Sequence, residues 1–130
     1  MLSRRSLLLS ATLPIFVSAA QAATFAGFTQ EAFEAAQAAG KPILVDITAS
    51  WCPTCKAQKP IIEEITGRDA FKDMVVLHVD FDSQKDVVRS LGARMQSTLI
   101  VFRGVDEVAR SVGETDAAAI EAQLGKAVSG

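Results

Sequence analysis

The stretch Trp51-Cys52-Pro53-Thr54-Cys55-Lys56 contains both cysteines and the single tryptophan of the chain. An apolar run from Pro42 to Thr48 precedes it and predicts a buried strand, and the residues from Lys56 to Thr66 predict a helix. A Cys-x-x-Cys pair at the point where a strand passes into a helix is typical of a redox-active cysteine pair. We therefore take this stretch as the feature around which the rest of the chain is arranged.

The composition describes one globular domain. The chain has 130 residues, of which 49% are hydrophobic, enough for one buried core. Its net charge of −2 gives no reason to expect a nucleic-acid partner. No apolar run reaches the roughly 18 residues of a membrane span. Two cysteines in one short loop are also too few for a disulfide-rich scaffold.

The first 22 residues are predicted to be a secretory signal peptide, and residues 23–130 to be the mature domain. Arg4 and Arg5 form a positive start, an uncharged and mostly apolar segment follows, and Ala20-Gln21-Ala22 is a small-x-small cleavage site. An uncleaved membrane anchor is the alternative. The arginine pair resembles the twin-arginine export signal of bacteria, with the general secretory route as the other option. We therefore expect the domain to reside in the periplasm, an oxidising compartment.

The mature segment alternates between predicted strands and helices, which indicates βαβ units. The expected class is an α/β fold with a central mixed sheet and helices on both faces. A hairpin at residues 104–106 adds an antiparallel edge. Thr29, Ser83 and Thr115 are the predicted caps of three helices. The strands are expected at 43–48, 74–81, 98–102 and 107–112, with a short one at 24–28, and the helices at 30–39, 56–66, 84–91 and 116–128.

Several separate landmarks resemble the thioredoxin family. The Trp51–Lys56 stretch is similar to the family's Trp-Cys-x-x-Cys-Lys. Asp46 stands where the family has a buried acid, and Pro60 stands where the family's helix is kinked. The match runs over about residues 28–127 and also includes Gly92, the strand from Thr98 to Phe102, and Val112-Gly113. The resemblance implies a thioredoxin-like fold and a thiol–disulfide oxidoreductase of the protein-disulfide reductase type.

The cysteine pair suits exchange of electrons with a partner's disulfide. Cys52 is expected to be the N-cap of its helix, where unpaired N–H groups and the helix dipole favour an exposed, reactive thiolate. Pro53 fits the first helical position. Cys55 follows one helical turn later, within disulfide reach, so we expect Cys52 to attack and Cys55 to resolve. A structural disulfide and a zinc half-site completed by His78 are the alternatives.

The resemblance implies roles for residues around the pair. Asp46 is expected to take the proton of Cys55 through water, and the alternative is a carboxylate simply satisfied by nearby N–H groups. His78, the only histidine, falls opposite Asp46 on the neighbouring strand and would make the pair sensitive to pH near neutrality, unless it is merely packed. Lys56 is expected to modulate the pair as well. We expect partners to contact Trp51, Pro53, Thr54, Ser97 and Thr98.

Ser97 is a departure from the family, which has a cis-proline at this position. A cis bond before a residue other than proline costs about 2.5–4 kcal/mol, so we expect the Gln96–Ser97 bond to be trans. The loop still faces the cysteines and can offer backbone groups to an extended partner segment. An ordinary loop serine is the favoured interpretation of Ser97, and a hydroxyl that donates a hydrogen bond to a cysteine sulfur is the alternative.

The favoured function is an exported reductase that acts as a monomer and uses no cofactor beyond the Cys52–Cys55 disulfide. Resemblance to the reducing members of the family implies a membrane thiol reductase as electron donor. Oxidised envelope proteins such as apocytochrome c would be the acceptors. An oxidase that donates its disulfide, or a redox-inactive metal-binding module, is the alternative function.

Overall fold

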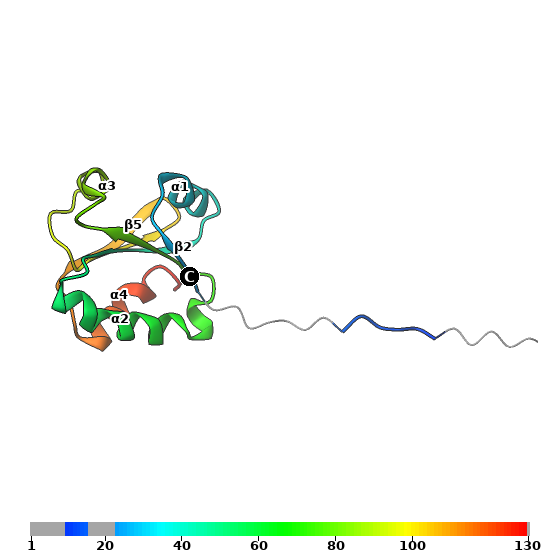
Figure 1. Cartoon of the computed structure of the whole chain (residues 1–130). Helices are drawn as coiled ribbons and strands as arrows, with labels where there is room; N and C mark the ends of the chain where they lie inside the picture. The colour runs from blue at the N-terminus through cyan, green and yellow to red at the C-terminus, as the bar shows by residue number, and fades with distance from the viewer. Residues whose placement is uncertain (1–9, 16–22, 130) are drawn as a thin grey trace, which may run out of the picture.

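The computed structural model describes residues 10–15 and 23–129 (Figure 1). The predicted signal peptide therefore lies mostly outside the described residues and stays a prediction. Within the described ranges, no helix has the length and apolar character needed to cross a membrane.

A five-stranded mixed sheet forms the centre of the molecule, as predicted. Its order is β1-β3-β2-β4-β5. Both β1 and β2 run parallel to β3, β4 runs antiparallel to β2, and β5 runs antiparallel to β4. The central position of β2 explains its apolar sequence, because both of its faces are covered. The strands are β1 (Thr24–Gly27), β2 (Pro42–Thr48), β3 (Val75–Asp80), β4 (Thr98–Arg103) and β5 (Asp106–Val112).

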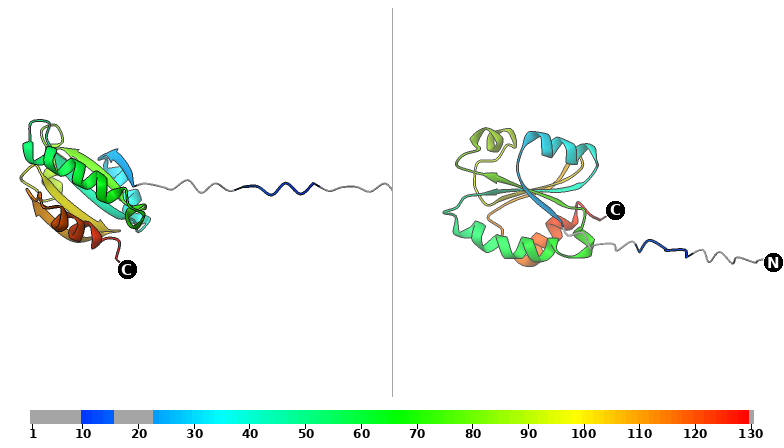
Figure 2. Two further views of the ribbon diagram at one scale, coloured as in Figure 1. Left: turned by 90° about the horizontal axis from the view of Figure 1, so that it is seen from below. Right: turned by 45° about the vertical axis from the view of Figure 1, so that its right-hand side comes forward.

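Helices cover both faces of this sheet, which confirms the predicted layer arrangement. Figure 1 shows α1 and α3 on one side of the sheet and α2 and α4 on the other. The left view of Figure 2 shows α2 and α4 side by side on their shared face. Each face has its own apolar core, one around Leu44, Ile62 and Ile120, the other around Ile43, Phe33 and Val88. The helices are α1 (Gln30–Ala38), α2 (Pro53–Thr66), α3 (Lys85–Ser90) and α4 (Ala117–Gly125), with a 3₁₀ turn, η1, at Asp69–Phe71.

One of the three predicted helix caps is correct. Thr29 Oγ1 accepts a hydrogen bond from the N–H of Ala32 at 3.0 Å. The Ser83 prediction was wrong, because α3 begins after Gln84 and has no side-chain cap. The Asp80 carboxylate instead accepts hydrogen bonds from two backbone N–H groups of this turn, including that of Ser83 at 3.1 Å.

The cap of α4 is displaced by one residue from the prediction. Asp116, rather than Thr115, is the N-cap, and its Oδ2 accepts from the N–H of Ala119 at 2.9 Å. Both residue types are good caps, so the sequence did not distinguish them. The helix also ends at Gly125, before the predicted end at 128. The helix predicted from residue 56 begins at Pro53, three residues earlier, because Cys52 is its N-cap and Pro53 fits the first helical position. The remaining element ends differ from the predictions by at most two residues, which is usual for fraying ends.

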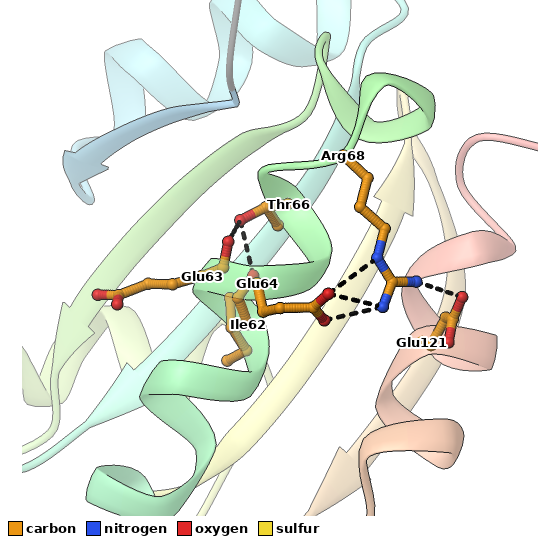
Figure 3. A network of polar contacts seen from close by, with 6 residues as sticks. All are labelled: Ile62, Glu63, Glu64, Thr66, Arg68 and Glu121. Carbon is orange, nitrogen blue, oxygen red and sulfur yellow. Dashed lines mark hydrogen bonds and ion pairs between the residues drawn. The ribbon is translucent and has the colours of Figure 1, made fainter.

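A polar network fixes the end of α2 that lies away from the cysteines (Figure 3). The Arg68 guanidinium contacts Glu64 at 2.8 Å and also Glu121 of α4. The Thr66 hydroxyl donates to the carbonyl of Ile62 at 2.7 Å. The ion pairs are largely exposed, so they contribute little to stability and serve mainly to orient α2 against α4.

Candidate active site

The two cysteines meet at the N-terminus of α2, as the sequence predicts. Cys52 is the N-cap, with an extended backbone at φ −88° and ψ 110°, and Pro53 is the first helical residue. The N–H of Cys55 donates to Cys52 Sγ at 3.1 Å. The Cys55 thiol donates to the same sulfur, with 2.6 Å between the two Sγ atoms. Both residues are free thiols in this structure, placed for exchange with a disulfide form.

The expectation of an exposed attacking sulfur was wrong. Cys52 is only 2% exposed and Cys55 8%. Both pack in a small apolar cluster with Ala49, and Phe81 contacts the cluster from the side. A partner must therefore reach a recessed sulfur rather than one that projects from the surface.

The thiol of Cys55 is held in its protonated form. Burial is the largest cause that raises its pKa, from 9.0 to about 11, and the hydrogen bond to Cys52 adds to it. Backbone hydrogen bonding at Ala49 and Ser97 acts in the opposite direction and is outweighed. Cys55 is thus a poor nucleophile until a base removes its proton, which fits a thiol that acts second.

Asp46 and His78 form the predicted pair beneath the cysteines. They are directly opposite in the parallel register of β2 and β3. Asp46 Oδ2 lies 3.4 Å from His78 Nδ1, and the carboxylate side chain is 7% exposed while the imidazole is 41% exposed. The other oxygen, Asp46 Oδ1, is buried and has no hydrogen-bond partner in the described part of the chain.

A pocket connects this pair to the resolving cysteine. It has a volume of about 430 Å³ and is lined by Cys55, Asp46 and His78, among other residues. The exposed side chains of Lys56 and Lys59 lie at the same pocket. The structure therefore brings together Cys55, Asp46, His78 and Lys56, all of which the sequence singled out.

Ser97 adopts a conformation that the sequence did not predict. Its φ of +58° makes it the single non-glycine residue with positive φ among the described residues, and no cis peptide occurs there. The trans bond before it was expected. The Ser97 hydroxyl donates to the carbonyl of Gln96 at 2.5 Å and not to a cysteine sulfur, which agrees with the favoured interpretation of an ordinary loop serine. The Ser97 N–H is also engaged, with the carbonyl of Ile47 at 2.7 Å.

Gln58 holds this loop in place, and the sequence analysis missed it. Its amide Nε2 donates to the carbonyl of Ser97 at 3.3 Å and to that of Glu114 at 2.9 Å. The side chain is fully buried inside α2, between Cys55 and Ile62. The signal was available, since Gln58 is a polar residue at an inward position of α2, one helical turn before the buried Ile62.

The expected partner-binding residues divide into two groups. Trp51 is 55% exposed, and its indole N–H donates to Asp82 Oδ2 at 2.8 Å. Pro53 is exposed and Thr54 is partly exposed, so for these three a contact with partners stays a prediction. Thr98, in contrast, is buried and donates to the carbonyl of Met95 at 2.6 Å, which leaves it to shape the loop.

The chain belongs to the thioredoxin family. Residues 24–126 match the family model described as Thioredoxin. A thioredoxin of Mycobacterium tuberculosis is 36% identical over 88 residues, which cover 68% of this chain and 75% of that protein. Thioredoxin H2-1 of rice, Oryza sativa subsp. japonica, is 36% identical over 64% of this chain, and the match spans only 59% of the rice protein's length.

Solved structures show the same fold. The crystal structure of Trxlp from Edwardsiella tarda superimposes with a TM-score of 0.76 at 40% identity, covering 78% of this chain and 98% of that one. A thioredoxin of Malassezia sympodialis, at 22% identity, shows the fold alone with a TM-score of 0.73, covering 84% of this chain and 94% of the other.

Family and site together define a thiol–disulfide oxidoreductase whose redox group is its own cysteine pair. Thioredoxins need no cofactor, and the cysteine pair here occupies the position of their reactive disulfide. Across residues 10–15 and 23–129, no three His, Cys, Asp or Glu side chains gather as a metal-binding group.

Proposed function

We propose that the protein reduces disulfides of exported proteins in the bacterial periplasm, using the Cys52–Cys55 dithiol. One observation carries the proposal: two free thiols lie 2.6 Å apart at a helix N-terminus, and burial raises the pKa of the second, Cys55, to about 11. A helix N-terminus favours a thiolate on Cys52, whereas burial keeps the Cys55 thiol protonated until the second step of the reaction.

The reaction follows from this asymmetry. The Cys52 thiolate attacks one sulfur of the partner's disulfide, and the partner's other sulfur leaves as a thiolate. Cys55 then loses its proton and attacks Cys52 Sγ, which releases the second partner thiolate and forms the Cys52–Cys55 disulfide. Two electrons pass to the partner, and two thiols of this chain become one disulfide.

The sequence before the domain supports the location. Arg4 and Arg5, the uncharged segment after them and the Ala20-Gln21-Ala22 site are the parts of a bacterial export signal. The periplasm is kept oxidising, so an idle dithiol there becomes a disulfide. The reductase therefore requires an electron donor, for which a membrane thiol reductase is the proposed source. Oxidised envelope proteins, apocytochrome c among them, are the proposed acceptors, and the domain acts as a monomer.

The reduction potential tests the direction of electron flow. A reduction potential of about −270 mV supports a reductant. A reduction potential of about −120 mV instead supports an oxidase that donates its disulfide to partners. The alternative function is an oxidase of this kind. Pro53, directly after the attacking cysteine, is the feature that supports this alternative.

Trapping in cells tests the location and the partners. A Cys55→Ser variant of the full chain retains the attacking sulfur but cannot resolve, so it should accumulate mixed disulfides with periplasmic proteins. The Cys52→Ser, Cys55→Ser double variant is the matched control. N-terminal sequencing of the same material should place the mature start near residue 23. Recovery of cytoplasmic partners alone would refute the periplasmic assignment.

A further inference from the structure

The imidazole of His78 is held against the carboxylate of Asp46 by its surroundings. The register of β2 and β3 sets the two residues side by side, with 3.4 Å between Nδ1 and Oδ2. On the other side, the ring of Phe25 from β1 stacks on the imidazole, with 5.9 Å between ring centroids and 21° between planes. The imidazole of His78 therefore packs between the ring of Phe25 and the carboxylate of Asp46.

The second oxygen of Asp46, Oδ1, makes no hydrogen bond with His78 or with any other group of the described residues. It is also buried. An unpaired buried carboxylate oxygen is costly unless it binds water or takes a proton. Asp46 and Cys55 line the same pocket of about 430 Å³, a volume that can hold water. One oxygen of Asp46 thus lies next to His78, and the other is buried without a protein partner among the described residues.

We propose that His78 carries the proton of Cys55 from Asp46 to solvent in the step that releases the reduced partner. This inference rests on the reductase function proposed above. His78 acts through Asp46 and does not touch the partner, so it is a positioning and proton-transfer residue. Its 41% exposed side chain gives it access to bulk water that the 7% exposed carboxylate lacks.

The atoms and electrons of the step balance. The S–H bond of Cys55 breaks, and the electron pair stays on its sulfur and attacks Cys52 Sγ. The Cys52–Cys55 bond forms, and the bond from Cys52 Sγ to the partner's sulfur breaks, with its electron pair leaving on the partner as a thiolate. The proton forms a new O–H bond on Asp46, through water. It then passes to the neutral imidazole of His78, which releases a proton to solvent. Transfer to His78 brings the proton to a side chain that is 41% exposed, whereas the carboxylate side chain is 7% exposed.

Other charges face His78 and set its electrostatic background. From α2, Lys59 and Glu63 line a small pocket together with His78 and Asp46. Lys56 of α2 and Asp80 of β3 line the larger pocket on the other side. Phe25, the β1 residue that packs on the ring, carries no charge. The charged groups near His78 are therefore of both signs, two lysines and the acids Glu63 and Asp80.

The proposal predicts the sign of a pH dependence. His78 accepts a proton only when its imidazole is neutral. The resolving step should therefore accelerate as the pH rises and level off once the imidazole is neutral. A variant without an acceptor at this position should be slower and should lack this rise and plateau.

A two-phase reaction isolates the resolving step. The reduced full chain is mixed with excess dithiobis(nitrobenzoate), whose leaving thiolate absorbs visible light. The first equivalent is released when Cys52 attacks, and the rate of that phase depends on reagent concentration. The second is released when Cys55 attacks Cys52 Sγ, at a rate independent of concentration. We expect His78→Asn to slow only the second phase, by about tenfold or more at pH 7.5, within the range of general acid–base effects.

Two further variants separate a proton relay from a simple charge effect. His78→Lys keeps a cation beside Asp46 but removes the neutral acceptor, and it should be as slow as His78→Asn. Lys59→Met removes a neighbouring cation and should keep the wild-type pH profile. An unchanged first phase shows that each variant is folded at the active site.

The outcomes are distinct. A second phase in His78→Asn with the wild-type rate and pH profile would overturn the relay and leave the reductase function intact. Full recovery of rate in His78→Lys would overturn it in favour of a charge effect. Absence of a second equivalent from the wild-type chain would overturn the dithiol function and the relay together.

Discussion

The backbone N–H of Cys55 donates a hydrogen bond to the Sγ of Cys52 at 3.1 Å, so the two cysteines of the pair are in direct contact. Cys52 receives hydrogen bonds from both the amide and the thiol of Cys55. The same thiol contact adds to the burial that raises the pKa of Cys55. One short turn of helix therefore separates the first and the second nucleophile of the reaction.

The two cysteines should respond differently to replacement by serine. Cys52→Ser should abolish insulin reduction, since the remaining thiol, Cys55, is buried and its raised pKa of about 11 keeps it protonated. Cys55→Ser should also lose turnover but should still release one equivalent of thiolate from an aromatic disulfide. Mass spectrometry of the products checks the assignment: a stable adduct on Cys52→Ser instead of on Cys55→Ser would reverse the two roles.

The stability of the reduced protein should fall at high pH. Folding raises the pKa of Cys55 from 9.0 to about 11, so the folded state retains the proton more strongly. The resulting stability is complete below pH 9 and is lost as the pH rises through about 11, a change on the order of 2 kcal/mol. Urea unfolding at a series of pH values under reducing conditions measures it. Cys55→Ser is the control, and an equal loss in that variant would assign the effect to other groups.

Gln58→Leu should loosen the loop at Ser97. The substitution keeps the size of the side chain but removes the donor to the carbonyls of Ser97 and Glu114. We expect a loss of about 1–2 kcal/mol in the free energy of unfolding, because the buried Ser97 carbonyl loses a donor. Hydrogen exchange at the amide of Gly113, which donates to the same carbonyl at 3.0 Å, should become faster. Ala57→Leu, on an exposed position of the same helix, should change neither quantity.

Glycine and proline at position 97 should have opposite effects. Glycine adopts the observed φ of +58° without steric cost, so Ser97→Gly should be neutral or stabilising by up to about 1 kcal/mol. Proline fixes φ near −65° and lacks the N–H that donates to Ile47, so Ser97→Pro should destabilise by about 2 kcal/mol or more. Thermal unfolding of both variants checks this. Equal melting temperatures would show that the loop rebuilds around proline.

The sequence was sufficient for the fold and for the reactive pair because these depend on local patterns. An apolar run, a capping cysteine and a proline at the first helical position determine the geometry at Cys52 without distant contacts. The pairing of Asp46 with His78 also followed, since parallel strands in the family's order place those positions side by side.

The features that the sequence did not reveal depend on long-range contacts. The positive φ of Ser97 results from hydrogen bonds to Ile47 and Gly113, which lie on other segments of the chain. The burial of Cys52 depends on how closely Ala49 and Phe81 pack around it. Gln58 was missed because its two partners are 39 and 56 residues away along the chain.

The near-complete burial of Cys52 has a consequence for selectivity. With 2% of the residue exposed, the sulfur is out of reach for a disulfide that lies within the compact surface of a folded partner. Small disulfides, and disulfides carried on a protruding segment of a protein, are the ones that can approach it. The recessed sulfur therefore acts as a steric filter that favours flexible or unfolded clients over compact ones.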